Sequence, residues 1–212
     1  MSTSAPGRGR FISLEGGEGV GKSTQLRALS KALTERGIDC ILTREPGGSA
    51  GAEAIRELLL QGEDGRWSIE AEALLFAAAR ADHVEKTIRP ALERGQWVLS
   101  DRFVDSSFAY QGEAGGLGVG RVRELHRFAT GGFLPDRTLL LSLAEGQERA
   151  KARDRDTVDR IGGRAEDFHQ GVELAFRALA ADEPGRVRLI DASGSEEQVT
   201  ERLLDAISEL LP

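Results

Sequence analysis

Cysteine and asparagine are almost missing from this chain, which has one cysteine, Cys40, and no asparagine at all. A single thiol excludes an internal disulfide and a zinc site built from several cysteines, and it fits a reducing cytoplasm. The lack of asparagine argues against a GTP-driven switch protein, because such a protein needs an asparagine-based motif to recognise guanine. We therefore expect a cytoplasmic protein of another class.

Excess positive charge is missing too, since 28 Lys and Arg residues face 35 Asp and Glu residues, for a net charge of -7. Nucleic acids are held mainly by clustered Lys and Arg, so we expect no nucleic-acid partner, and an ATPase that moves nucleic acid is disfavoured. No apolar run is long enough to span a bilayer, and residues 1–9 lack the apolar segment of a signal peptide. We expect no membrane partner, a flexible leader over residues 1–9, and a single domain over residues 10–212.

The stretch from Phe11 to Thr24, FISLEGGEGVGKST, dominates what is present. An apolar run precedes the spacing Gly, four residues, Gly-Lys-Ser, and a helical pattern follows, which is the form of a phosphate-binding loop between a strand and a helix. Glycines let backbone N–H groups turn towards phosphate oxygens, and the helix that begins near Lys22 adds its positive end. We predict that the chain binds ATP through Gly16, Gly17, Glu18, Gly19, Val20, Gly21, Lys22, Ser23 and Thr24.

Strand-like and helix-like segments alternate along the rest of the chain. Apolar strands are predicted near residues 11–14, 38–43, 97–99, 138–141 and 187–190. A long helix with a bend near Pro90 is expected over residues 69–93. Residues 106–111 are expected to resume as helix, and the glycine-rich residues 112–120 to form a flexible connection. The pattern predicts the α/β fold of a P-loop NTPase, a doubly wound parallel sheet of about five strands flanked by helices.

Polar residues follow several of these strands and should share the carboxyl edge of the sheet, where such folds bind ligands. The stretches are 44–48, 101–102 and 191–195, and the first contains Pro46. Asp101 suits a role in holding Mg²⁺ together with Ser23, directly or through water. Arg44 and Arg102 are predicted to form a second phosphate site, because a guanidinium group can bind phosphate through two hydrogen bonds. Two phosphate sites indicate phosphoryl transfer rather than hydrolysis.

Two helical faces are predicted to hold a base. Phe76 and Arg80 are four residues apart, so a helix presents an aromatic ring and a donor on one side. Ser107, Tyr110 and Gln111 share another face, and the Gln111 amide can both donate and accept.

Arginines and aspartates are dense between residues 145 and 164. We interpret residues 149–165 as a lid that brings positive charge onto the transferring phosphoryl group, with Arg149 contacting ATP. The histidines His83, His126 and His169 are read as surface or partly buried structural residues without metal spacing.

The chain resembles bacterial thymidylate kinases from Phe11 to about Ser195, in the motifs LEGGEGVGKST, REPGG with IRELLL, LLFAAARADHVEKTIRPAL, SDRF with SSFAYQG, and DRI with FH. The resemblance implies phosphorylation of dTMP to dTDP with ATP and Mg²⁺, without a general base, by a homodimer. It also implies that Arg153 or Arg155, in the lid, takes part in catalysis with Lys22, Asp101 and Arg102. The residues that it implies for dTMP binding are Glu18 at the sugar 3'-hydroxyl, Phe76 on the base, Arg80 and Gln111 at its polar edge, Arg44 and Arg102 at the phosphate, and Tyr110 under the sugar, with Pro46 and Ser107 nearby.

The chain departs from the family pattern at five positions, which are Ala79, Ser142, Gly162, Gly171 and Glu173. These departures concern the lid and turnover more than the nucleotide sites. A kinase for a different nucleoside monophosphate stays open as the alternative, since phosphate-binding residues are shared and only the base and sugar contacts would differ.

Overall fold

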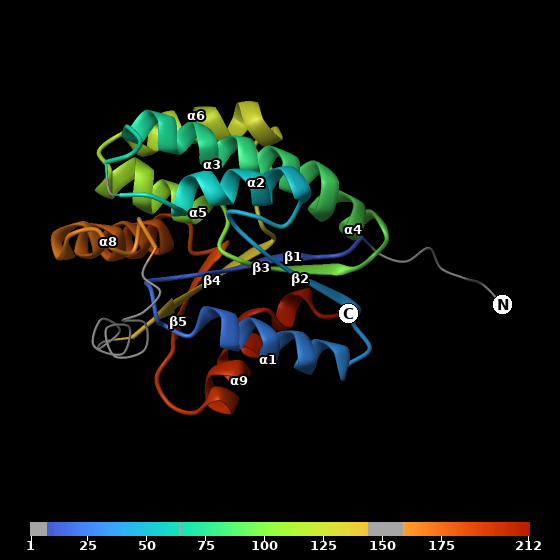
Figure 1. The fold of residues 1–212 in the computed structure, drawn as a ribbon. Helices are drawn as coiled ribbons and strands as arrows, with labels where there is room; N and C mark the ends of the chain where they lie inside the picture. Colours follow the sequence, from blue (N-terminus) through green and yellow to red (C-terminus); the bar gives the residue numbers. More distant parts are fainter. Residues whose placement is uncertain (1–7, 64, 144–158) are drawn as a thin grey trace.

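A five-stranded parallel sheet forms the centre of the molecule, in the order β2-β3-β1-β4-β5 (Figure 1). The computed structural model describes residues 8–63, 65–143 and 159–212. The strands are β1 (Phe11–Glu15), β2 (Cys40–Arg44), β3 (Trp97–Asp101), β4 (Arg137–Ser142) and β5 (Val187–Asp191). The predicted doubly wound α/β fold with about five strands is confirmed.

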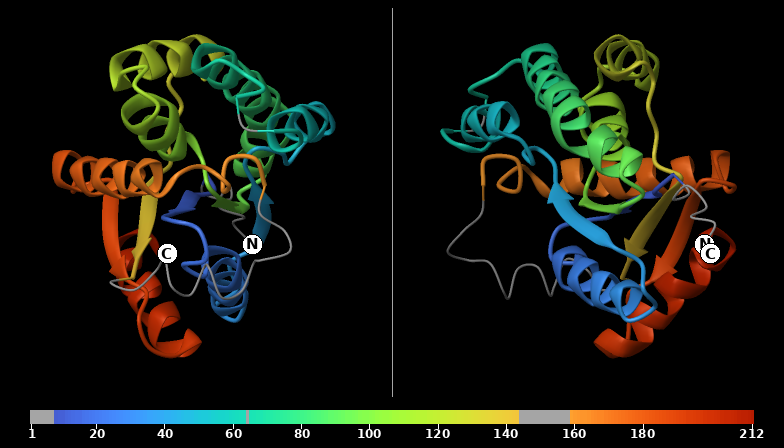
Figure 2. Two further views of the ribbon diagram at one scale, coloured as in Figure 1. Left: turned by 60° about the vertical axis from the view of Figure 1, so that its left-hand side comes forward. Right: turned by 90° about the vertical axis from the view of Figure 1, so that its right-hand side faces the viewer.

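Helices cover both faces of the sheet, as the views in Figures 1 and 2 show. One face carries α1 (Lys22–Thr34) and α9 (Glu196–Ala206). The helices on the other side are α2 (Ala50–Leu60), α3 (Ile69–His83), α4 (Arg89–Glu93), α5 (Val104–Ser107), α6 (Val119–Thr130) and α8 (Glu166–Asp182). Within the described ranges, no helix has the length and apolar character that crossing a membrane requires.

Alternation along the strands divides the hydrophobic core between these two layers. Phe11 belongs to the cluster under α4, α6 and α8, whereas its neighbour Ile12 belongs to the cluster under α1 and α9. Val98 and Leu99 are divided between the clusters in the same way. Successive side chains of a strand point to opposite faces, so continuous apolar runs are what a sheet covered on both sides requires.

The predicted interruption of the long helix lies just before Pro90. After α3 the chain forms a π-helical segment, η1 (Val84–Ile88), and α4 then begins at Arg89. The N–H of Arg89 donates to the carbonyl of Val84, five residues back. Proline has no N–H to continue an α-helical ladder, so it is tolerated at the start of the new helix.

The prediction of a flexible connection over residues 112–120 is wrong for most of that segment. A second π-helical segment, η2 (Phe108–Ala114), continues from α5, and α6 already begins at Val119. The short link between them is closed by the N–H of Gly118, which donates to the carbonyl of Gly112 at 2.8 Å. Packing of η2 against α6 and α8 outweighs the low helix propensity of its glycine.

Candidate active site

The phosphate loop joins β1 to α1 as predicted. Gly16 and Gly21 have φ angles of 136° and 95°, a region that side chains rarely adopt. A Cβ at Gly16 would also lie 2.4 Å from the carbonyl oxygen of Leu141. The Lys22 ammonium donates to the carbonyl of Gly17 at 2.7 Å and so lies back over the loop. The remaining predicted loop residues, Glu18, Gly19, Val20, Ser23 and Thr24, follow the same turn into the helix.

Lys22 is buried and close to another cation. Burial, and after it the positive charge of Arg102, together lower the pKa of its ammonium from 10.5 to about 8, against the negative charges of Asp101, Glu15 and Glu18. An anion bound beside Lys22 and Arg102 would stabilise the charged form of the buried ammonium, because it would compensate both positive charges. The environment of Lys22 thus suits a polyphosphate.

Ser23 and Asp101 are brought together, although 78 residues separate them in the chain. The Ser23 hydroxyl donates to Oδ2 of Asp101 at 2.5 Å, from the first turn of α1 to the end of β3. A hydroxyl and a carboxylate are hard oxygen ligands of the kind that Mg²⁺ prefers. In the part of the chain that the structure describes, no group of three or more His, Cys, Asp and Glu side chains could hold a metal by itself. Most ligands of a Mg²⁺ ion here would come from phosphate and water.

A cavity opens at the carboxyl ends of β2 and β3, walled by α2, α3 and η2. Eight of the predicted substrate residues line it: Glu18, Pro46, Phe76, Arg80, Arg102, Ser107, Tyr110 and Gln111. The other lining residues are Glu45, Arg56, Leu60, Phe103, Ser106, Asp159 and Ile161. The two predicted helical faces, on α3 and η2, therefore meet across one space.

Arg80 is 3% exposed and held from two sides. Its Nε donates to Oε2 of Glu45 at 2.7 Å, and its Nη2 donates to Oγ of Ser107 at 2.9 Å. A buried guanidinium needs such partners because an unpaired charge in the interior is costly. Glu45 was not predicted, although it lies inside the REPGG stretch. Its carboxylate fixes the direction in which Arg80 meets the cavity.

The interpretation of the histidines as surface or partly buried is wrong for His83 and His126, which are both buried. His83 donates from Nδ1 to Oε1 of Glu45 at 3.0 Å, so the same carboxylate serves both His83 and Arg80. The other ring nitrogen of His83 lies 2.7 Å from the hydroxyl of Thr43. These contacts are consistent with the predicted structural role of His83.

Arg102 has a φ angle of 69°, and it is the only non-glycine residue in the described ranges with a positive φ angle. Such left-handed backbone costs about 1–2 kcal/mol in an L-residue and often marks a functional position. Its Nη1 donates to Ser106 at 3.0 Å, and its Nη2 donates to the Tyr110 hydroxyl at 3.2 Å. Burial opposes its charge, but Tyr110 and Glu15 raise the pKa of Arg102, so that it stays a cation.

Glu15 supports this strained turn, and it too was not predicted. The carboxylate accepts from the N–H of Phe103 at 2.7 Å and from the hydroxyl of Ser106 at 2.6 Å. Burial, and then the negative charge of Asp105, raise the pKa of Glu15 to about 8. Its position directly before Gly16 in the loop motif is the one signal in the sequence that could have found it.

Arg44, the last residue of β2, and Arg56, in α2, lie in different places. Arg44 is outside the cavity lining; its side chain is 56% exposed and pairs with Glu53 at 3.1 Å. Arg56, from α2, lines the cavity and donates from Nη1 to the carbonyl of Pro46 at 2.6 Å. The expected phosphate contact of Arg44 stays a prediction, while the structure offers Arg56 in the cavity itself.

The predicted lid is described only at its C-terminal end. Arg149, Arg153 and Arg155 lie outside the described residues. Arg160 is buried and, like Arg164, donates to the carboxylate of Glu72 in α3. These two arginines are therefore anchored to the cavity wall.

Gly162, one of the departures from the family pattern, lies against Glu18. A Cβ there would be 2.5 Å from a Glu18 carboxylate oxygen. The glycine thus leaves room for the side chain that is expected to meet the sugar. The other departures lie in α3 (Ala79), at the end of β4 (Ser142) and in α8 (Gly171 and Glu173).

Comparisons with known proteins agree on one family. The family model described as thymidylate kinase matches residues 14–203. A thymidylate kinase of Rhizorhabdus wittichii is 58% identical over 206 residues, covering 96% of this chain and 99% of that protein. A thymidylate kinase of Bradyrhizobium diazoefficiens is 49% identical, with 97% and 92% covered. The crystal structure of a thymidylate kinase from Ehrlichia chaffeensis matches with a TM-score of 0.77 at 29% identity, over 96% of this chain and 99% of that one.

The matched residues include the phosphate loop, the cavity and both flanking helical layers. The fold and the matched family agree with the resemblance that the motifs indicated. This chain belongs to the thymidylate kinase family.

Proposed function

We propose that this protein transfers the γ-phosphoryl group of ATP to the phosphate of dTMP, forming dTDP and ADP with Mg²⁺. The observation that carries the proposal is the cavity beside the phosphate loop, which is lined by an aromatic ring from α3, an amide from η2 and several guanidinium groups. Phe76 and Gln111 suit a pyrimidine base, and Arg56 and Arg102 suit a monophosphate. Family membership supports the same assignment.

The acceptor is itself a phosphate, so no general base is needed. A phosphomonoester has a second pKa of about 6 and is largely dianionic at neutral pH. One of its oxygens attacks the γ-phosphorus as the bond to the β-phosphate oxygen breaks, and ADP leaves. Catalysis then depends on alignment and on neutralising charge, which we assign to Lys22, Arg102 and the lid arginines Arg153 and Arg155.

Mg²⁺, when bound, supplies charge neutralisation on the phosphates, and we assign its protein contacts to Ser23 and Asp101. The hydrogen bond between these two oxygens supports the assignment, because it brings both oxygen ligands together where α1 begins and β3 ends. We assign ATP binding to the loop residues Gly16–Thr24, with Arg149.

The sugar contacts follow from the same cavity. Glu18 is assigned to the 3'-hydroxyl, and Tyr110 to the position where a ribose 2'-hydroxyl would be disfavoured. Tyr110 is buried against Phe168 and Phe176, with ring centroids 6.0 and 6.4 Å away, and these contacts leave its ring little freedom to move aside.

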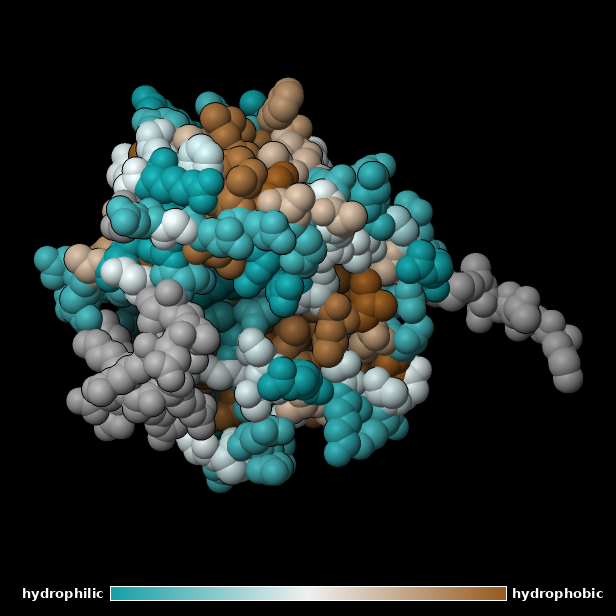
Figure 3. All heavy atoms as spheres, in the orientation of Figure 1, coloured by the Kyte–Doolittle hydropathy of each residue, from teal (hydrophilic) through white to brown (hydrophobic). Residues whose placement is uncertain are grey.

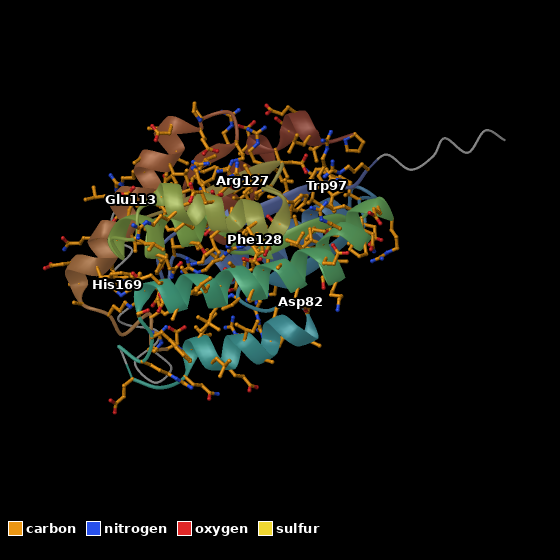
Figure 4. The ribbon with its side chains drawn as sticks, turned by 90° about the horizontal axis from the view of Figure 1, so that it is seen from above. Asp82, Trp97, Glu113, Arg127, Phe128 and His169 are labelled. Carbon is orange, nitrogen blue, oxygen red and sulfur yellow. The ribbon has the colours of Figure 1, made fainter. Side chains whose placement is uncertain are left out.

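We also propose a homodimer in the cytoplasm, formed through the layer of α3 and α6. Phe128 on α6 is 91% exposed and Leu74 on α3 is 58% exposed, and the two helices pack together. Hydrophobic side chains gather at the top of the molecule over these helices (Figure 3), and the view from above labels Phe128 on α6 beside α3 (Figure 4). A second copy of the chain would cover this surface. Light scattering tests it: Phe128→Glu should give a monomer, and an unchanged dimer would place the interface elsewhere.

The test of the activity is ADP formation from ATP and Mg²⁺ with each nucleoside monophosphate offered singly. We expect strong turnover with dTMP, weak turnover with dUMP, and none with ribonucleotides. Preference for another monophosphate would favour the alternative, a kinase with different base specificity. Indifference to every monophosphate would mean that the cavity does not hold the acceptor.

A further inference from the structure

Glu72 is a carboxylate in the first turn of α3 with no exposed surface. Its Oε2 accepts from Nη2 of Arg164 at 2.6 Å and also from Nη2 of Arg160. Its Oε1 accepts from Nε2 of Gln111 at 2.9 Å. Two guanidinium groups compensate the buried charge, so the third contact is not needed for neutralisation.

The third contact determines how Gln111 is oriented. A carboxylate between guanidinium groups can only accept hydrogen bonds, so the NH₂ end of the Gln111 amide must face it. The carbonyl end, Oε1, is then the polar atom left for the cavity that Gln111 lines. No donor among the described residues is hydrogen-bonded to this oxygen. Oε1 of Gln111 is therefore a hydrogen-bond acceptor available to a ligand in the cavity.

Glu72 and Phe76 are one helical turn apart on α3, and Gln111 approaches from η2. The carboxylate thus belongs to a residue one turn from the ring on which a base would stack. It also holds Arg160, whose neighbours Asp159 and Ile161 line the cavity. A change at Glu72 reaches the base site through Gln111 and the cavity wall through Arg160, and the test must separate the two routes.

We infer that Glu72 is a positioning residue for base selectivity, a role that rests on the proposed function. It holds the Gln111 amide so that Oε1 accepts from the N3–H of thymine or uracil. Cytosine carries an unprotonated N3 instead, and two acceptors would then face each other without a proton. An unsatisfied pair of buried polar groups discriminates strongly between otherwise similar ligands.

The experiment compares kcat/KM for dTMP and for dCMP, together with calorimetric binding of each, in the unchanged protein and in Glu72→Gln. A glutamine at position 72 can present either a donor or an acceptor, so the Gln111 amide can turn. We expect the preference for dTMP over dCMP to fall about tenfold or more. Glu70→Gln is the matched control, because it removes the same charge from an exposed position in the same helical turn; its preference should stay unchanged.

A purely structural role for Glu72 would give a different result. Loss of the anchor for Arg160 would lower the melting temperature and reduce kcat/KM for both monophosphates by the same factor. An unchanged preference in Glu72→Gln would overturn the inference. So would a further loss of preference when Glu72→Gln is added to Gln111→Ala, since the effect must pass through the amide.

Glu72→Asp covers the case in which Glu72→Gln does not fold. It keeps the negative charge between the arginines but withdraws the carboxylate by one methylene from Gln111, so the preference should again fall. A folded Glu72→Asp with the full preference would overturn the inference. If the protein without substitutions neither binds nor phosphorylates dTMP, the proposed function is overturned as well. If it prefers dTMP, but the variants keep the same ratio of kcat/KM for dTMP to kcat/KM for dCMP, this inference alone is overturned.

Discussion

Substitution of Arg56 tests whether the cavity holds the acceptor phosphate. Arg56→Ala removes a guanidinium group that lines the cavity and that is oriented by its hydrogen bond to the Pro46 carbonyl. A hydrogen bond to a charged group contributes about 1.5–3 kcal/mol, and about 1.4 kcal/mol is a factor of ten. We therefore expect kcat/KM for dTMP to fall about tenfold to a hundredfold, mainly through a higher KM.

Arg44→Ala is the matched comparison, because it removes the same group from the end of β2. The Arg44 side chain is mostly exposed and pairs with Glu53 outside the cavity lining. Exposed ion pairs contribute about 0.2–1 kcal/mol, so if the phosphate lies beside Arg56 and not beside Arg44, kcat/KM should change by less than about fivefold. The assay is ADP formation at saturating ATP with dTMP varied, and thermal unfolding checks that both variants fold. A loss in Arg44→Ala as large as that in Arg56→Ala would refute the placement of the phosphate beside Arg56.

Three further predictions concern charge. Burial lowers the pKa of Lys22 to about 8, so ATP affinity measured by calorimetry should weaken as the pH rises from about 7 to about 9, and a flat profile would contradict this. Gly162→Glu would place a carboxylate against Glu18, so KM for dTMP should rise severalfold without loss of thermal stability; an unchanged KM would show that Glu18 does not contact the substrate. Burial lowers the pKa of His126 from 6.5 to about 4, and its Nε2 donates to the Phe133 carbonyl. The unfolded state therefore binds more protons between these values, so urea stability should fall as the pH drops from about 6.5 to about 4, and this slope should flatten in His126→Gln.

Local rules in the sequence were enough for the fold and for the phosphate loop. The spacing of Gly16, Gly21 and Lys22 after an apolar run predicted the strand, loop and helix that the structure contains. Alternating apolar runs and helical patterns likewise predicted a parallel sheet covered on both sides. The four-residue spacing of Phe76 and Arg80 placed both on one helical face, and both line the cavity. Each of these predictions rests on a pattern of a few neighbouring residues, which is why the sequence alone was enough to make it.

Local rules failed where competing contacts decide the outcome. The glycine-rich segment after Gln111 was read as flexible, but packing of η2 against α6 and α8 keeps it helical to Ala114. Only the tertiary structure shows that Arg44 pairs with Glu53 at the surface whereas Arg56 lies in the cavity. Nothing in the local sequence ranks these partners.

The hydrogen-bond partners of the buried carboxylates around the site are set by the tertiary structure alone. Glu45 joins Arg80 to His83 across 35 and 38 residues, and Glu72 joins Gln111 to Arg160 across 39 and 88 residues. A buried charge must find a partner, but the sequence does not say which one, because the partner is set by how distant segments pack. The sequence by itself determined that a phosphate-binding α/β enzyme would form, and the packing of α3 against η2 decided which atoms of the cavity face a base.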